Sequence, residues 1–239
     1  MSVLTLVRHG QASYMSQDYD KLSDIGELQC RKLAEFWLRH GFEFDIVIQG
    51  PAKRHARSAE IVAEEYATAG QLWPEPIVIP ELDEFDAFRM MQIMAPVLAT
   101  QDEEIRALAA SFEANRHTPE AGRDLQKLFE AVCRVWCNGE YDVDGLESWV
   151  AFRLRVETAL LQIREITPKS SNVVAFTSGG PIAASVGYTL GLSNAKAIEF
   201  VWLTRNASVS EFVFSGSRFS MASFNSIPHL DDRTLVTYR

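Results

Sequence analysis

Six short apolar runs rich in β-branched residues recur along the chain and predict buried strands. They cover residues 3–7, 46–48, 77–79, 173–176, 208–214 and 219–224. Strands of a parallel sheet are buried on both faces, so they read as continuous apolar runs rather than as alternating ones. Only a short segment around Ser215 and Gly216 separates the last two runs, which predicts an antiparallel hairpin at one edge of the sheet.

Apolar positions at helical spacing separate most of these runs. The helical patterns extend from Ser23 to Gly41, from Arg54 to Gly70 and from Pro181 to Gly191. Ser23 is a favourable N-cap, Pro181 suits a first helical turn, and a glycine ends each pattern. Strands that alternate with helices indicate an α/β fold with three layers, α/β/α, and a mainly parallel central sheet.

The region from about residue 87 to residue 145 has a different pattern. It contains long helical stretches over 102–116 and 123–137 and no convincing strand. We therefore expect residues 1–239 to form a single domain with a helical insertion at about 87–145, lying over the open end of the sheet.

Composition and charge narrow the class of partner. Hydrophobic residues make up 47% of the chain and charged residues 23%, and the formal net charge is −9. This acidity disfavours a nucleic acid or an anionic membrane surface as a partner. The first apolar run is interrupted by Arg8, so it is too short for a signal peptide or a membrane span.

Cysteine usage predicts a reducing compartment. The chain has only Cys30, Cys133 and Cys137, which make no disulfide framework and fit a cytoplasmic protein. Cys133 and Cys137 can share one helical face. Because no nearby histidine completes a tetrahedral site, packing is their predicted role and no metal is expected.

The candidate chemistry follows the first predicted strand, which runs directly into Arg8, His9, Gly10 and Gln11. In an open α/β sheet, ligands bind beyond the carboxyl ends of the strands. Arginine grips phosphate oxygens with two N–H groups, and glycine lets the backbone approach closely. An imidazole can accept a phosphoryl group covalently, so His9 is a candidate nucleophile of a phosphate site.

Further motifs follow this segment in a fixed order. They are LSDIGELQ at 22–29, GPAKRHARSA at 50–59, LDE at 82–84, GLES at 145–148 with RV at 155–156, and Asn206, Asn225 and His229-Leu230. Together with LVRHG at 6–10, this set resembles the histidine phosphatase superfamily, whose fold is that of phosphoglycerate mutase. The corresponding family elements are L-[ST]-x-x-G-x-x-Q, S-P-L-x-R-A-x-x-T-A, L-x-E and G-E-S…R-V. An ordered set is far more specific than a single short pattern.

The resemblance implies a role for each matching residue. His9 attacks phosphorus, Arg8 and Arg54 hold the phosphoryl oxygens, and the protonated Glu84 gives a proton to the leaving alcohol. The remaining candidate substrate contacts are Gln11, Ser178 and Gly179, and no cofactor or metal is implied. Without the resemblance, Glu84 reads as an ordinary surface carboxylate. For residues 53–57 the alternative is a solvated helix start, but cations at a helix N-terminus oppose the helix dipole, so this cluster indicates a bound anion.

One departure from the family pattern bears directly on the chemistry. The family carries a second histidine in an S-H-G-G context, where this chain has Ser178 followed by Gly179 and Gly180. Losing one preorganised donor of this kind typically costs about 10²–10³ in rate. Backbone amides at the predicted helix N-terminus still favour an anion. The sequence does not identify which of the chain's five histidines, if any, replaces that imidazole.

These observations favour a metal-independent phosphomonoester hydrolase that acts through a phosphohistidine. The expected ligand is a small phosphate ester or inorganic phosphate, and the insertion is expected to select the leaving group. Two alternatives stay open at this stage. One is a phosphate-binding protein with weak or no turnover, which Ser178 favours, and the other is a mutase of the phosphoglycerate type.

Overall fold

The structure is a computed structural model that describes residues 1–13, 20–139, 143–216 and 218–238. The chain divides into two compact units. The first comprises residues 1–84 and 155–239, and the second comprises residues 85–154. Each unit is described by itself.

A six-stranded sheet forms the centre of the first unit, in the order β3-β2-β4-β1-β5-β6. The strands are β1 (Ser2–Arg8), β2 (Ile46–Gln49), β3 (Ile77–Val78), β4 (Asn172–Thr177), β5 (Val209–Ser215) and β6 (Arg218–Ser226). The first four strands of that order are mutually parallel, whereas β5 and β6 add an antiparallel edge. All six predicted strands and the edge hairpin are therefore confirmed.

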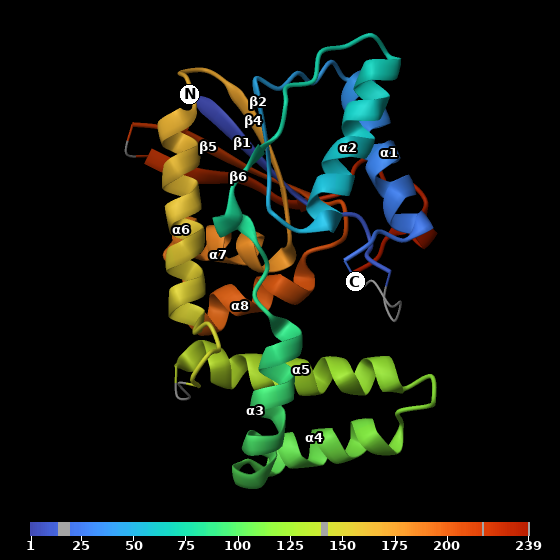
Figure 1. Cartoon of the computed structure of the whole chain (residues 1–239), viewed down its shortest axis with the longest axis vertical. Coiled ribbons are helices and arrows are strands. Elements are labelled where there is room, and N and C mark those ends of the chain that lie inside the picture. Colours follow the sequence, from blue (N-terminus) through green and yellow to red (C-terminus); the bar gives the residue numbers. More distant parts are fainter. Residues whose placement is uncertain (14–19, 140–142, 217, 239) are drawn as a thin grey trace. The chain divides into compact units, whose positions relative to one another are not determined.

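Helices cover both faces of this sheet (Figure 1). Against one face pack α1 (Asp24–Arg39) and α2 (Lys53–Thr68), and against the other pack α6 (Trp149–Ile166, from residue 155 onward) and α7 (Gly179–Leu190). In β4, Val174 and Phe176 face the first pair while Val173 and Ala175 face the second. This alternation explains the continuous apolar run, since fully burying a valine or phenylalanine side chain stabilises the fold by about 1.5–3 kcal/mol.

The remaining elements of the first unit are α8 (Asn194–Leu203) and the short 3-10 helices Pro80–Leu82 and Arg233–Leu235. The helix ends follow the predicted signals. The Ser23 hydroxyl accepts a hydrogen bond from the Gly26 amide at the start of α1, and Gly191 ends α7 in the left-handed region, with φ of 62°. No sequence signal predicted α8.

The second unit is helical, as predicted. It consists of α3 (Ala87–Gln101), α4 (Glu103–Ala114), α5 (Ala121–Asn138) and the first part of α6. Its core is a group of packed aromatic rings: Phe85, Phe129, Trp136, Trp149 and Phe152. The position of this insertion over the sheet stays a prediction. No helix within the described ranges has the length and apolar character needed to cross a membrane.

Candidate active site

The loop after β1 holds His9 in a nearly enclosed position, with 6% of the residue exposed. Its amide donates to the carbonyl of Thr177 at the end of β4, at 2.9 Å. Its ring Nδ1 lies 2.6 Å from the carbonyl oxygen of Gly10. A carbonyl only accepts, so this contact assigns the hydrogen to Nδ1 and leaves the lone pair on Nε2.

The electrostatic environment keeps this imidazole neutral. Burial lowers the pKa of His9 well below its usual value, and the nearby charges of Arg54 and Arg8 lower it further. A neutral ring is the form that can attack an electrophile. The arrangement therefore presents a neutral imidazole with its lone pair on Nε2, within range of the charges of Arg54 and Arg8.

Close backbone contact fixes the loop against α1. A Cβ on Gly10 would lie 2.3 Å from the Gly26 carbonyl oxygen, so no larger residue fits there. The Gln11 amide donates to Gln29 Oε1 at 2.8 Å, and its side-chain Oε1 accepts from the Ser23 hydroxyl at 2.9 Å. Gln11, a predicted substrate contact, is thus engaged in holding the loop to α1.

Arg8, the last residue of β1, reaches toward the segments that follow α8 and the second 3-10 helix. Its Nη1 donates to the carbonyl oxygens of Thr204 and Tyr238. The guanidinium passes beside Gly179, where a Cβ would lie 3.7 Å from Cζ. Arg8 and Gly179 are therefore neighbours, as the predicted site requires.

Arg54 stands in the first turn of α2 and joins two of the other site residues. Its Nη1 donates to Asp20 at 2.6 Å, and its Nη2 donates to the Ser178 hydroxyl at 3.4 Å. The Asp20 carboxylate also accepts from the Lys53 amide at 2.8 Å. A cationic helix start needs an anion. Here Asp20, which no sequence pattern singled out, supplies one.

The N-terminus of α7 brings Ser178 and Glu84 to the same edge of the sheet. Ser178 is fully buried at the N-cap position, yet its side chain makes no cap bond to the helix. The Gly180 amide, predicted to be open to a bound anion, donates instead to Glu84 Oε2 at 3.0 Å. Of the predicted site residues, His9, Arg54, Ser178 and Glu84 thus converge where β1 and β4 end.

His55 is the functional candidate that the sequence reading missed. The alternative interpretation of residues 53–57, a solvated helix start, does not apply to His55, which is 0% exposed. The ring turns inward, and its Nε2 lies 2.6 Å from Ser178 Oγ. Its centroid is 5.8 Å from that of His9. Burial, followed by the charge of Arg54, lowers the pKa of His55 well below its usual value.

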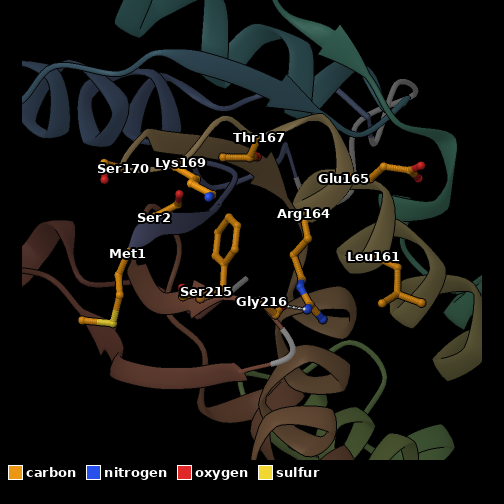
Figure 2. Close-up of a pocket in the computed structure, with 11 residues that line it drawn as sticks. Met1, Ser2, Leu161, Arg164, Glu165, Thr167, Lys169, Ser170, Ser215 and Gly216 are labelled. Atoms are coloured by element: carbon orange, nitrogen blue, oxygen red, sulfur yellow. Dashed lines mark hydrogen bonds between the residues drawn. The ribbon is translucent and has the colours of Figure 1, made fainter.

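The opposite edge of the sheet carries a separate hollow of about 480 Å³ (Figure 2). It lies where β1 begins and β5 ends, and its lining includes Met1, Arg164 and Lys169. Arg164 donates to the Gly216 carbonyl, as the dashed line shows. This hollow is at the amino end of β1, so it does not belong to the site around His9. Within the described ranges, no group of three or more His, Cys, Asp or Glu side chains is arranged to hold a metal ion.

The sequence pattern of the histidine phosphatase superfamily (branch 1) matches residues 4–138 and 117–227 of the chain. The chain belongs to the histidine phosphatase superfamily. Comparison with curated proteins gives no significant match.

Solved structures place this histidine phosphatase superfamily member in the phosphoglycerate mutase-like fold. YhfR of Bacillus stearothermophilus superposes with a TM-score of 0.65 at 18% identity, covering 97% of this chain and 100% of that one. A phosphoserine phosphatase variant of Entamoeba histolytica, in complex with phosphoserine, gives 0.59 at 19% identity, covering 96% and 100%. Phosphoglycerate mutase of Bacillus anthracis gives 0.63 at 15% identity, covering 96% and 95%. At these identities the similarity shows the fold alone.

Proposed function

We propose that this protein is a metal-independent phosphomonoesterase that transfers the phosphoryl group of a small phosphorylated metabolite to His9 and then to water. The observation that carries the proposal is the state of His9. The ring is neutral, its Nδ1 hydrogen is engaged by the Gly10 carbonyl, and Arg54 and Arg8 lie close enough to lower its pKa. A neutral imidazole within range of two guanidinium charges suits attack on a phosphate ester.

The first chemical step forms a bond between His9 Nε2 and phosphorus while the bond from phosphorus to the ester oxygen breaks. Arg54 and Arg8 offset the charge on the equatorial oxygens. Glu84, in its protonated form, gives its proton to the departing alkoxide. Its position is supported by the bond from the Gly180 amide, which holds the carboxyl group beside Ser178.

The second step returns His9 to its starting state. The Glu84 carboxylate takes a proton from water, the water oxygen bonds to phosphorus, and the bond between phosphorus and His9 Nε2 breaks. Inorganic phosphate leaves, and Glu84 is protonated for the next cycle. The phosphoserine held by the Entamoeba histolytica relative supports a small phosphate monoester as the substrate class.

Binding of phosphate without turnover is the second candidate. Ser178 favours it, because a hydroxyl carries no charge where the family has an imidazole. Retention of a nucleophile and a carboxyl group at one edge of the sheet favours the hydrolase. Among the site residues that the structure describes, no specific feature favours a mutase.

The test is hydrolysis of p-nitrophenyl phosphate by the wild type, with and without EDTA, and by His9→Ala. We expect activity that EDTA does not reduce and that falls by at least about 10⁴-fold in His9→Ala, because the nucleophile is lost. His117→Ala is the matched control, since this histidine is exposed on the second unit, and it should keep wild-type activity.

Labelling with a phosphate ester completes the test. The wild type should carry acid-labile, base-stable phosphate that is missing from His9→Ala. Glu84→Gln should lose about 10²-fold in rate on an alkyl phosphate, whose poor leaving group needs the proton, and much less on p-nitrophenyl phosphate. Undiminished activity in His9→Ala would refute the phosphohistidine route, and binding without labelling would favour the second candidate.

A further inference from the structure

A histidine on α2 stands against the serine that occupies the family's second histidine position. His55 Nε2 and Ser178 Oγ are 2.6 Å apart, and both residues are 0% exposed. A serine at an N-cap normally bonds to the amides of its own helix. Ser178 makes no such bond, so its hydroxyl is directed to His55 and Arg54 instead.

The space for this ring exists because residue 50 is glycine. A Cβ on Gly50 would lie 2.5 Å from His55 Nδ1 and 2.9 Å from the Leu82 carbonyl oxygen. The φ angle of Gly50 is not in the left-handed region, so backbone conformation does not require glycine there. Glycine is required there because any larger residue would clash with the His55 imidazole and the Leu82 carbonyl. The motif that residues 50–59 resemble has serine and alanine where this chain has Gly50 and His55.

We propose that His55 is the positioning residue that takes over the task of the missing imidazole, by holding the Ser178 hydroxyl and Arg54 against the transferring phosphoryl group. This inference rests on the proposed phosphatase function. His55 acts through Ser178 and does not itself touch the substrate.

The hydrogen bonds at Ser178 Oγ leave its hydroxyl free to donate to a ligand when His55 Nε2 carries a hydrogen. Arg54 Nη2 donates to Ser178 Oγ at 3.4 Å, which uses one lone pair of the hydroxyl. When His55 Nε2 carries a hydrogen, it donates to the second lone pair, and the hydroxyl hydrogen is left for a phosphoryl oxygen. In the other tautomer, His55 Nε2 accepts the hydroxyl hydrogen, and Ser178 Oγ turns a lone pair toward the anion. A bound anion therefore favours the tautomer with the hydrogen on Nε2. His55 thus fixes both the place and the direction of the Ser178 donor.

The same geometry predicts a reciprocal exchange. An imidazole at position 178 would run into the His55 ring, because the shorter serine side chain already lies 2.6 Å from it. Ser178→His alone should therefore lower activity by about 10-fold or more, since misplacing reacting groups by about 1 Å can cost about 10². In the double variant His55→Ala/Ser178→His the second imidazole has the vacated space, and activity should recover at least about 10-fold over Ser178→His.

The experiment measures kcat and KM for p-nitrophenyl phosphate in the wild type, Ser178→His, the double variant, His55→Leu and His55→Gln. His55→Leu keeps the buried volume and should lose about 10- to 100-fold in kcat/KM, with a lower kcat and a higher KM. His55→Gln keeps a hydrogen-bonding atom near the Nε2 position and should retain most of kcat. A packing role alone would give the opposite order, so equal or better activity in His55→Leu than in His55→Gln overturns the proposal.

Binding of inorganic phosphate by titration calorimetry separates this inference from the proposed function. Turnover that persists in His9→Ala would refute the phosphohistidine route. It would leave the phosphate affinities of the His55 variants as an independent test. If no variant turns over, His55→Leu should still bind phosphate about 10-fold more weakly than wild type, and the double variant should recover that affinity. Unchanged phosphate affinity in a folded His55→Leu protein, or a gain in Ser178→His that the double variant does not exceed, overturns the role of His55.

Discussion

The two strand ends that meet at the site, those of β1 and β4, differ in how the side chains beyond them are held. After β1, His9 is held mainly through main-chain groups: its amide bonds to Thr177, its ring to the Gly10 carbonyl, and its carbonyl accepts from the Ala207 amide. After β4, Ser178 is held by a chain of side chains that runs through Arg54 to Asp20 and includes His55.

This difference explains where the sequence departs from the family pattern. A side chain held by main-chain groups needs the local backbone that surrounds it, so the segment from Arg8 to Gly10 keeps every motif residue. A side chain held by other side chains can be exchanged when its partners change with it. Gly50, His55 and Ser178 form one such exchange, in which the imidazole reaches the site from α2 rather than from the end of β4.

The largest effect is expected from removing Arg54, which lies at the centre of the side-chain network around Ser178. Arg54→Ala should lower kcat/KM for p-nitrophenyl phosphate by about 10³-fold, because it removes a donor to the phosphoryl group and releases Ser178. Arg54→Lys should lose about 10²-fold, since one ammonium group cannot serve Asp20 and Ser178 in the fork geometry of arginine. Steady-state kinetics at neutral pH measures both.

Arg57→Ala is the control on the same helix. Arg57 pairs with Glu27, Glu60 and Glu64 on the surface, and exposed pairs of this kind contribute little. Its activity should stay within about twofold of wild type. A loss of less than about 10-fold in Arg54→Ala would contradict the central place of Arg54 in the site.

The next prediction concerns stability, with an effect of medium size. It compares Gly10, which follows β1, with Gly50, which makes room for the His55 ring beside Ser178. In Gly10→Ala, the new Cβ meets the Gly26 carbonyl, which is backbone and cannot withdraw. In Gly50→Ala it meets both the His55 ring and the Leu82 carbonyl. Overpacking of this kind typically costs about 1–3 kcal/mol, and urea unfolding should show a loss of that order in both variants.

A second substitution distinguishes the two glycines. Adding His55→Ala should offset part of the loss in Gly50→Ala, with a coupling energy of about 0.5–3 kcal/mol, because the ring is one of its two clashes. The same addition should give no coupling with Gly10→Ala. Equal coupling in both cycles would contradict the assignment of Gly50 to the space of the imidazole.

The fold followed from the sequence because its signals are local and repeated. The six apolar runs, the Ser23 cap and the glycine that ends α7 each record a short-range requirement. The helix α8 was missed because its apolar pattern is short. Its N-cap residue, Ser193, makes no side-chain cap bond.

The site followed only in part, and the reason is distance along the chain. The segment around His9 is contiguous, so one motif predicted it. His55 and Ser178 are 123 positions apart, and Asp20 and Arg54 are 34 apart. Such side-chain contacts leave no periodic trace in one sequence. The three departures from the family motifs, at Gly50, His55 and Ser178, were the available signal, and only the fold shows that these residues meet.

The smallest effect is expected for His229, a buried histidine outside the site. It separates the effect of burying a histidine from the role of His55 in turnover. His229 is 5% exposed, and burial lowers its pKa to about 4, from a usual value of 6.5. Between these values the unfolded chain binds a proton that the folded chain does not, so stability is complete above pH 6.5 and falls as the pH drops toward 4. Between pH 7.5 and pH 5.5, His229 should account for a loss of roughly 1.4 kcal/mol. Urea unfolding of His229→Leu at both pH values should show a loss smaller by that amount. His55→Leu should reduce the pH-dependent loss in the same direction, because the pKa of His55 is also lowered by burial.

The two variants should differ in turnover, since only His55→Leu should lower kcat. An equal fall in kcat for His229→Leu would mean that burial of a histidine, rather than its place beside Ser178, controls turnover.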